Sequence, residues 1–212
     1  MTNLKRLKYH DVYIFEKSKD DISYKHFIQV LKKEHSNSKL NFTFSNGRFS
    51  LHNDKTLKEN LILDVLPQNF KSDFNQELIL FISKQTNLHA IEIIKSLGNL
   101  NRYPRDLAPE ELQLFSIAKS IFSPQHFLLF NFPEKNLSSS TLKIVKKAIE
   151  FEAMDNQRTI IINSNEIFQW INICTKIVIK NDLDLDIKKI VDDNETPISE
   201  QSKEQIKLDQ VA

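Results

Sequence analysis

The clearest pattern of apolar and polar positions lies between residues 107 and 138, where a helix is predicted to lead into a buried strand. Apolar side chains recur on one broad face from Leu107 to Ile121, and FLLF at residues 127–130 is a continuous apolar run. Pro109 suits a first helical turn, and Ser123-Pro124 ends the helix before the strand. The stretch therefore predicts a helix, a buried strand and then a polar turn into another helix.

The remaining elements follow from the same kind of pattern. Strands are predicted at 12–15, 40–44 and 158–163, with a last strand before residue 181. Helices are predicted after the first strand, in two segments between about 67 and 100, after Ser138, which serves as a cap, and after residue 164. Gly98 is expected to end the second of the two middle helices. From residue 182 onward the sequence turns polar, which predicts a flexible tail.

Four segments resemble the ATP-binding subunits of ABC transporters. In step with the family's signature helix are Leu107, Glu111, Gln113, Ile117, Ala118 and Lys119. In step with its Walker B strand and D-loop are Leu128, Leu129, Pro133, Asn136 and Leu137. TIIINSNEI at 159–167 is similar to the family's TVIIVTHDI, and Phe44 to Asn60 keeps its Q-loop frame. The Asn-Leu ending is most like the short subunits of the FtsE and LolD type.

This resemblance implies the fold. It predicts an α/β protein of the P-loop NTPase-like (ABC ATPase) type, with a mostly parallel sheet flanked by helices. A helical subdomain is expected at about 67–106, and the N-terminal β-lobe of the family is expected to be reduced, because the spacing before the Q-loop frame is short. The ABC-like domain would span 1–181, and 182–212 would be the polar tail.

Composition changes the chemical part of this picture. The chain has only two glycines, Gly47 and Gly98, where average usage of about 7% would give roughly fifteen. A phosphate-binding P-loop needs glycines so that successive backbone N–H groups converge on phosphate, and a lysine to follow them. Neither glycine precedes a lysine and the two lie far apart, so no P-loop of ordinary composition is expected.

The residues that the resemblance places at catalytic positions are also replaced. Asn131 stands at the Walker B aspartate, Phe132 at the catalytic glutamate and Asn165 at the histidine that touches the γ-phosphate. An amide carries no charge and a phenyl ring accepts no proton. Glu134 could serve as a base only through a rearranged loop. The degenerate nucleotide- and magnesium-binding positions are Tyr24, Lys25, Ser45, Ala108, Pro109, Glu110 and Ser138.

The charge balance and the length of the apolar runs limit which partners and which cellular location are expected. Basic and acidic residues nearly balance, 29 against 28, so wholesale binding to nucleic acid is not expected. Cys174 is alone, which excludes an intrachain disulfide and suggests a buried thiol. No apolar run approaches the roughly 20 residues that span a bilayer, so a cytoplasmic protein is the default.

The functional prediction is a pseudo-ATPase that needs no cofactor and works through its surfaces. By resemblance, its partner would be an integral-membrane permease-type subunit, FtsX-like in cell division, which would hold the protein at the inner face of the cell membrane. A homodimer or a heterodimer with another ABC-type subunit is also expected. Candidate partner-binding residues are Phe49, Leu51, Thr56, Leu57 and Tyr103. One alternative is a weakly active subunit that binds ATP and Mg²⁺, alone or within a mixed dimer, and another is a soluble scaffold.

Overall fold

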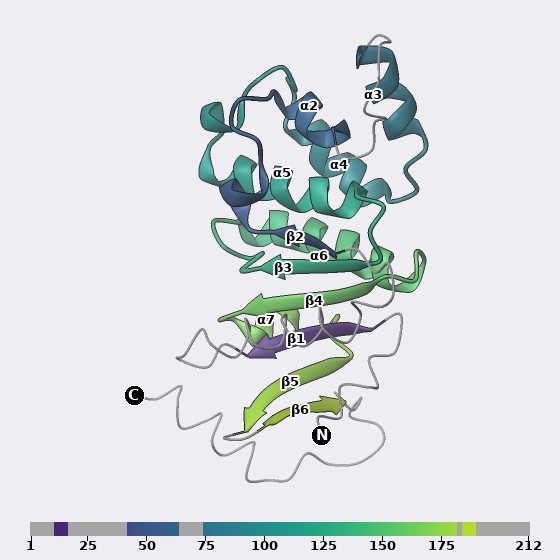
Figure 1. Cartoon of the computed structure of the whole chain (residues 1–212). Coiled ribbons are helices and arrows are strands. Elements are labelled where there is room, and N and C mark those ends of the chain that lie inside the picture. Colours follow the sequence, from purple (N-terminus) through teal and green to yellow (C-terminus); the bar gives the residue numbers. More distant parts are fainter. Residues whose placement is uncertain (1–10, 17–41, 64–73, 182–183, 190–212) are drawn as a thin grey trace.

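The computed structural model describes residues 11–16, 42–63, 74–181 and 184–189, and all its strands belong to one sheet (Figure 1). The strand order is β2-β3-β4-β1-β5-β6. The pairs from β2 through β5 are parallel, and only β6 runs antiparallel to its neighbour. The strands are β1 (Val12–Glu16), β2 (Phe42–Ser45), β3 (Phe127–Asn131), β4 (Thr159–Ser164), β5 (Lys176–Asn181) and β6 (Asp184–Lys189). This confirms the predicted α/β class with a mostly parallel sheet.

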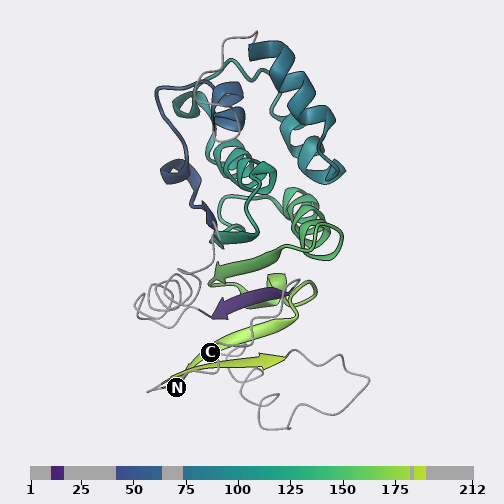
Figure 2. The same ribbon diagram turned by 45° about the vertical axis from the view of Figure 1, so that its right-hand side comes forward.

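Helices pack around the β2–β4 side of this sheet. Figures 1 and 2 both show α2, α3 and α4 beyond α5, at the end of the molecule opposite β5 and β6. The predicted helical region at about 67–106 contributes α3, α4 and η3 to the described residues. The helices are η2 (Gly47–Ser50), α2 (Leu57–Ile62), α3 (Phe74–Ser83), α4 (Leu88–Ser96), η3 (Pro104–Asp106), α5 (Pro109–Phe122), α6 (Ser139–Met154) and α7 (Ile167–Trp170).

The central strands and α5 form the core because their apolar runs are covered on both sides. Every residue of β4 is buried, and β3 is buried from Phe127 to Phe130. Parallel strands covered by helices on both faces need this continuous apolar character. Phe115, Ile117 and Ala118 of α5 are fully buried against the same core. The stretch that stood out in the sequence is therefore the structural centre of the described fold.

Local capping explains where several helices begin and end. Ser138 caps α6 by accepting a hydrogen bond from the Thr141 backbone N–H at 3.3 Å, as predicted. Gly98, with a φ of +68°, follows α4 and also matches the prediction. Helix α2 was not predicted, although its capping box is visible in the sequence. The Thr56 backbone N–H donates to Glu59 at 2.7 Å, and the Thr56 hydroxyl accepts from the Glu59 N–H at 3.4 Å.

The prediction of a polar tail from residue 182 is wrong for residues 184–189. This segment forms β6, which pairs antiparallel with β5 in the register Asn181↔Asp184 to Lys176↔Lys189. Its sequence, DLDIKK, alternates at the start with the period of two that favours a strand. High charge concealed this alternation, since edge strands often carry charged residues. Residues 190–212 lie outside the described part.

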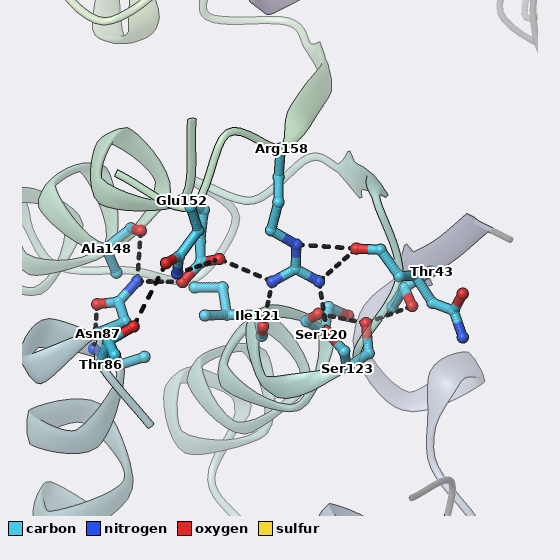
Figure 3. Close-up of polar contacts among 12 residues, drawn as sticks. Thr43, Thr86, Asn87, Ser120, Ile121, Ser123, Ala148, Glu152 and Arg158 are labelled. Atoms are coloured by element: carbon cyan, nitrogen blue, oxygen red, sulfur yellow. Dashed lines mark hydrogen bonds and ion pairs between the residues drawn. The ribbon is translucent and has the colours of Figure 1, made fainter. Parts of the chain in front are cut away.

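A buried polar network ties the helical region to the sheet at the amino ends of β3 and β4 (Figure 3). Glu152 of α6 accepts hydrogen bonds from Asn87 at 2.7 Å and from Arg158 at 2.7 Å. The Arg158 guanidinium also donates to the backbone carbonyls of Ile121, Ser123 and Gln125. Arg158 and Glu152 are 9% and 1% exposed, so each needs this complete set of partners.

Among the described residues, no helix has both the length and the apolar character needed to cross a lipid bilayer.

Candidate functional site

The candidate site lies at the carboxyl ends of β2, β3 and β4, which are adjacent in the sheet. Asn46 follows β2, Asn131 is the last residue of β3, and Asn163 lies opposite Asn131 in the parallel register. Ligands of open α/β sheets bind outside the carboxyl ends of the strands. The segment after β1, which carries Tyr24 and Lys25, lies outside the described residues. The described part of the site is therefore a group of three asparagines.

The three amides form one directional chain of hydrogen bonds. The Asn163 Nδ2 group donates to Asn131 Oδ1 at 2.5 Å, and Asn131 Nδ2 donates to Asn46 Oδ1 at 3.0 Å. The Asn163 side-chain oxygen is buried and has no hydrogen-bond partner among the described residues. A buried acceptor without a donor is costly, and such groups call for a functional or structural explanation. Within the described part of the structure, this row of hydrogen bonds thus ends, at the β4 side of the site, in an acceptor without a donor.

Phe132 occupies a tight turn immediately after β3. Its φ of +49° lies in the left-handed region, which is uncommon for a bulky residue. The turn is held because the Phe132 N–H donates to the Asn163 carbonyl at 2.7 Å, while the Gln113 amide donates to the Phe132 carbonyl at 3.2 Å. These two hydrogen bonds fix the backbone at Phe132, but its side chain is a phenyl ring with no acid–base chemistry.

Glu134 lies two residues beyond Phe132, and both of its carboxylate oxygens already have partners. One accepts from the Ser164 hydroxyl at 2.8 Å, and the other accepts from the indole N–H of Trp170 at 3.1 Å. Burial raises the pKa of this carboxyl above its usual value of 4.5, although these hydrogen bonds act in the opposite direction. Glu134 therefore connects the turn to β4 and α7. Asn165, after β4, is exposed and takes no part in the asparagine chain.

Ser45, expected at the magnesium-sensing position of the Q-loop frame, is buried at 1% exposure. Its hydroxyl lies 2.9 Å from the Ser116 hydroxyl of α5, which is also 2.7 Å from the Ser50 hydroxyl. The Ser45 side chain thus joins β2 to α5. In this arrangement its role is packing between the strand and the helix.

The signature positions make contacts within the chain. The Ala108 N–H donates to Glu111 at 2.9 Å, and Pro109 has no N–H to offer. Glu110 accepts from the Ser138 N–H at 3.1 Å and from the Thr141 hydroxyl at 2.7 Å. The Ser138 N–H is the main reason why the pKa of Glu110 lies below its usual value. These residues hold the start of α5 against the start of α6.

Two of the proposed partner-binding residues are corrected by their burial. Leu57 is fully buried and Leu51 is 8% exposed, because both belong to the core under α2, so neither side chain can form a docking surface. Thr56 is partly buried and caps α2. Tyr103 is partly exposed, with the Arg105 guanidinium 4.9 Å from its ring centre. The side chain of Phe49 lies outside the described part.

Sequence reasoning missed Asn46 and Asn163. Asn163 follows the apolar run of β4 and Asn46 follows Ser45 of β2, but their placement at one edge of the sheet depends on strand order and register, which the sequence does not show. Within the described ranges, no group of three or more His, Cys, Asp or Glu residues is arranged to hold a metal ion. The asparagine chain fits a neutral hydrogen-bonding site better than a magnesium site, because amides carry no charge to offset the cation.

Neither a scan against protein-family models nor a search of curated protein sequences gives a match. Solved structures do match. An ATP-binding subunit of an ABC transporter matches with a TM-score of 0.66 and 11% identity, over 94% of this chain and 83% of that chain. The cassette MJ0796, dimeric and bound to ADP and Pi, matches with a TM-score of 0.64 and 15% identity, over 87% and 88%.

A third match is a transporter described as of the metal-chelate ABC type, in an inward-facing conformation. Its TM-score is 0.63 at 15% identity, over 86% of this chain and 73% of that chain. At such identities the likeness establishes the fold. The chain therefore has the fold of an ABC ATP-binding cassette, as the resemblance in its sequence implied.

Proposed function

We propose that this protein is an ABC-type subunit that no longer hydrolyses ATP and acts by docking on a permease-like membrane protein. The observation that carries the proposal is the end of β3. An active cassette needs an aspartate and a glutamate where this chain has Asn131 and Phe132, and the Asn131 amide is already bonded to Asn46 and Asn163. The matched structures include cassettes of ABC transporters, one of them dimeric, which supports a membrane partner and a paired arrangement of subunits.

The finer assignment to cell division is an extension of the same proposal. It rests on the likeness of the Asn-Leu turn at 136–137 to FtsE-type subunits, whose partners are FtsX-like. In that arrangement the protein would lie at the inner face of the membrane without crossing it. Its work would be to transmit or stabilise a conformation of the partner.

The first test is ATP-Mg²⁺ binding by calorimetry, together with hydrolysis, on the full chain and on the chain co-purified with its membrane partner. An active cassette measured in parallel provides the positive control. We expect no hydrolysis in either sample. Saturable micromolar binding and turnover that are lost on changing Lys25 to alanine would overturn the proposal.

The second test concerns docking. Thr56 and Tyr103 are the candidates with described, partly exposed side chains. Because Thr56 caps α2, the substitution tested is Tyr103→Ala, which is expected to reduce co-sedimentation with partner-containing membranes. Phe168→Ala is the matched control, because Phe168 is 68% exposed on α7, far from α2 in Figure 1. Equal recovery of both variants and the unaltered protein with the membranes would remove Tyr103 from the docking surface.

Retained ATP binding is the second candidate function. It is supported by the Asn163 oxygen, a buried acceptor without a donor among the described residues, which could accept from a hydroxyl or amino group of a nucleotide at the edge where an α/β sheet binds ligands. An amide site could hold a nucleotide without the magnesium chemistry of hydrolysis. Calorimetry with and without EDTA separates this candidate from the first, because here binding should persist when Mg²⁺ is removed.

A further inference from the structure

A cleft lies between the turn after β3 and the helices α6 and α7. Its volume is about 590 Å³, within the usual range for small-molecule sites. Lys135 lines it from the turn, and Lys143 and Lys146 line it from α6. None of these three lysines forms an ion pair with another residue in the described part of the chain. The cleft thus holds three lysines and two carboxylates, Glu134 and Glu166, with no ion pair between them among the described residues.

Lys146 is the most informative of the three because it is partly buried. Its ammonium lies 5.7 Å from the ring centre of Trp170, a contact that attracts a cation without neutralising it. Removal from water lowers the pKa of Lys146. Burial raises the pKa of the neighbouring Cys174 thiol to about 12, so the thiol stays neutral and supplies no counter-charge.

The two acidic residues that line the same cleft accept hydrogen bonds from neutral groups of other residues. Glu134 accepts from Ser164 and Trp170, and Glu166 accepts from the Gln169 amide. A partly desolvated cation in the wall of a cleft is costly unless a partner offsets its charge. An anion entering the cleft would find lysines on two sides, Lys135 on the turn and Lys143 and Lys146 on α6, and lysine is a common ligand of phosphate groups.

We propose that this cleft binds a small multiply charged anion, of the phosphate or carboxylate kind, through Lys135, Lys143 and Lys146. The inference does not depend on the proposed loss of ATP hydrolysis, since Asn46, Asn131 and Asn163 do not line the cleft. It adds a ligand-binding function to a protein whose nucleotide site has lost its charged residues. Occupancy would bring α6, α7 and the turn together around one ligand.

Trp170 makes the test direct, because it is the single tryptophan of the chain and contacts Lys146. The full-length protein is titrated with pyrophosphate and, separately, with citrate, in Mg²⁺-free buffer at constant ionic strength. Tryptophan fluorescence and calorimetry are both recorded. A saturable response to pyrophosphate alone identifies a phosphate ligand, and a response to citrate alone identifies a carboxylate ligand.

Variants then assign the response to the cleft. Lys146→Met keeps the aliphatic length and removes the charge, and is expected to weaken binding by about tenfold. Lys146→Arg should restore most of the affinity. Lys143→Gln tests the cleft independently if Lys146→Met fails to fold. Lys147→Gln, an exposed lysine on the same helix that does not line the cleft, should bind as the unaltered protein does.

The proposal is overturned if neither anion gives a saturable response, or if chloride at equal ionic strength reproduces it. It is overturned equally if Lys146→Met and Lys143→Gln bind as tightly as Lys147→Gln does. Because no outcome depends on ATP or Mg²⁺, a negative result here leaves the proposed function to its own test.

Discussion

The two ends of the central strands carry polar networks of opposite character. At the amino ends, the buried charges of Arg158 and Glu152 are paired with each other, and Asn87 and backbone carbonyls complete the network, although the Thr159 hydroxyl beside it has no partner among the described residues (Figure 3). At the carboxyl ends, the hydrogen bonds of Asn46, Asn131 and Asn163 join neutral amides only, and within the described residues they end in a buried oxygen without a donor. The difference is one of charge. The paired ions fix how the helices pack, whereas the neutral amides leave one acceptor without a donor, among the described residues, at the edge where open α/β sheets bind ligands.

Breaking the charged network should have the largest effect. Glu152→Ala leaves the Arg158 charge buried without its carboxylate, and we expect a loss of about 3–5 kcal/mol in the free energy of unfolding. Chemical denaturation measured by circular dichroism tests this. Glu150→Ala, on the same helix and outside the network, is the matched control and should change the free energy by less than about 0.5 kcal/mol. Similar values for the two variants would contradict the distinction between the ends.

The neutral network should tolerate change better. Asn163→Ala removes one donor to Asn131, but it also removes the unsatisfied oxygen, so part of the cost is relieved. We expect a loss of about 1 kcal/mol, well below that of Glu152→Ala, in the same denaturation assay. A loss as large as that of Glu152→Ala would mean that the asparagine chain is a structural clamp as well.

The sequence predicted the buried strands and helices better than the contacts of the candidate site. Apolar runs identified β1, β3, β4 and α5, because burial imposes a pattern on consecutive residues. The pairing of Asn131 with Asn163 was missed, since register joins residues 32 positions apart. Leu57 was misassigned to the surface because its place in a family motif was weighed above its apolar character. Arg158 looked like an ordinary polar residue before a strand, and only its tertiary contacts show its role.

Glu134 should have the smallest effect on the free energy of unfolding, because its carboxyl is only partly buried and accepts hydrogen bonds from two donors. Its pKa is raised in the folded protein, so folding favours the protonated form. The stabilisation from Glu134 protonation is therefore fully present below the usual pKa of 4.5 and is lost as the pH rises through the folded value. Glu134→Gln mimics the protonated carboxyl and lacks this dependence.

The unfolding free energies of the unaltered protein and of Glu134→Gln should therefore be compared across pH 4 to 8, roughly the range in which a raised carboxyl pKa titrates. The unaltered protein should lose stability relative to the variant as the pH rises above about 4.5. Titrations common to both proteins cancel in the difference, so a difference that is constant or rises with pH would show that hydrogen bonds from Ser164 and Trp170 outweigh burial. In that case Glu134 would belong with the charged network, as a charged anchor of the turn, and the neutral character of the carboxyl end would be confined to the three asparagines.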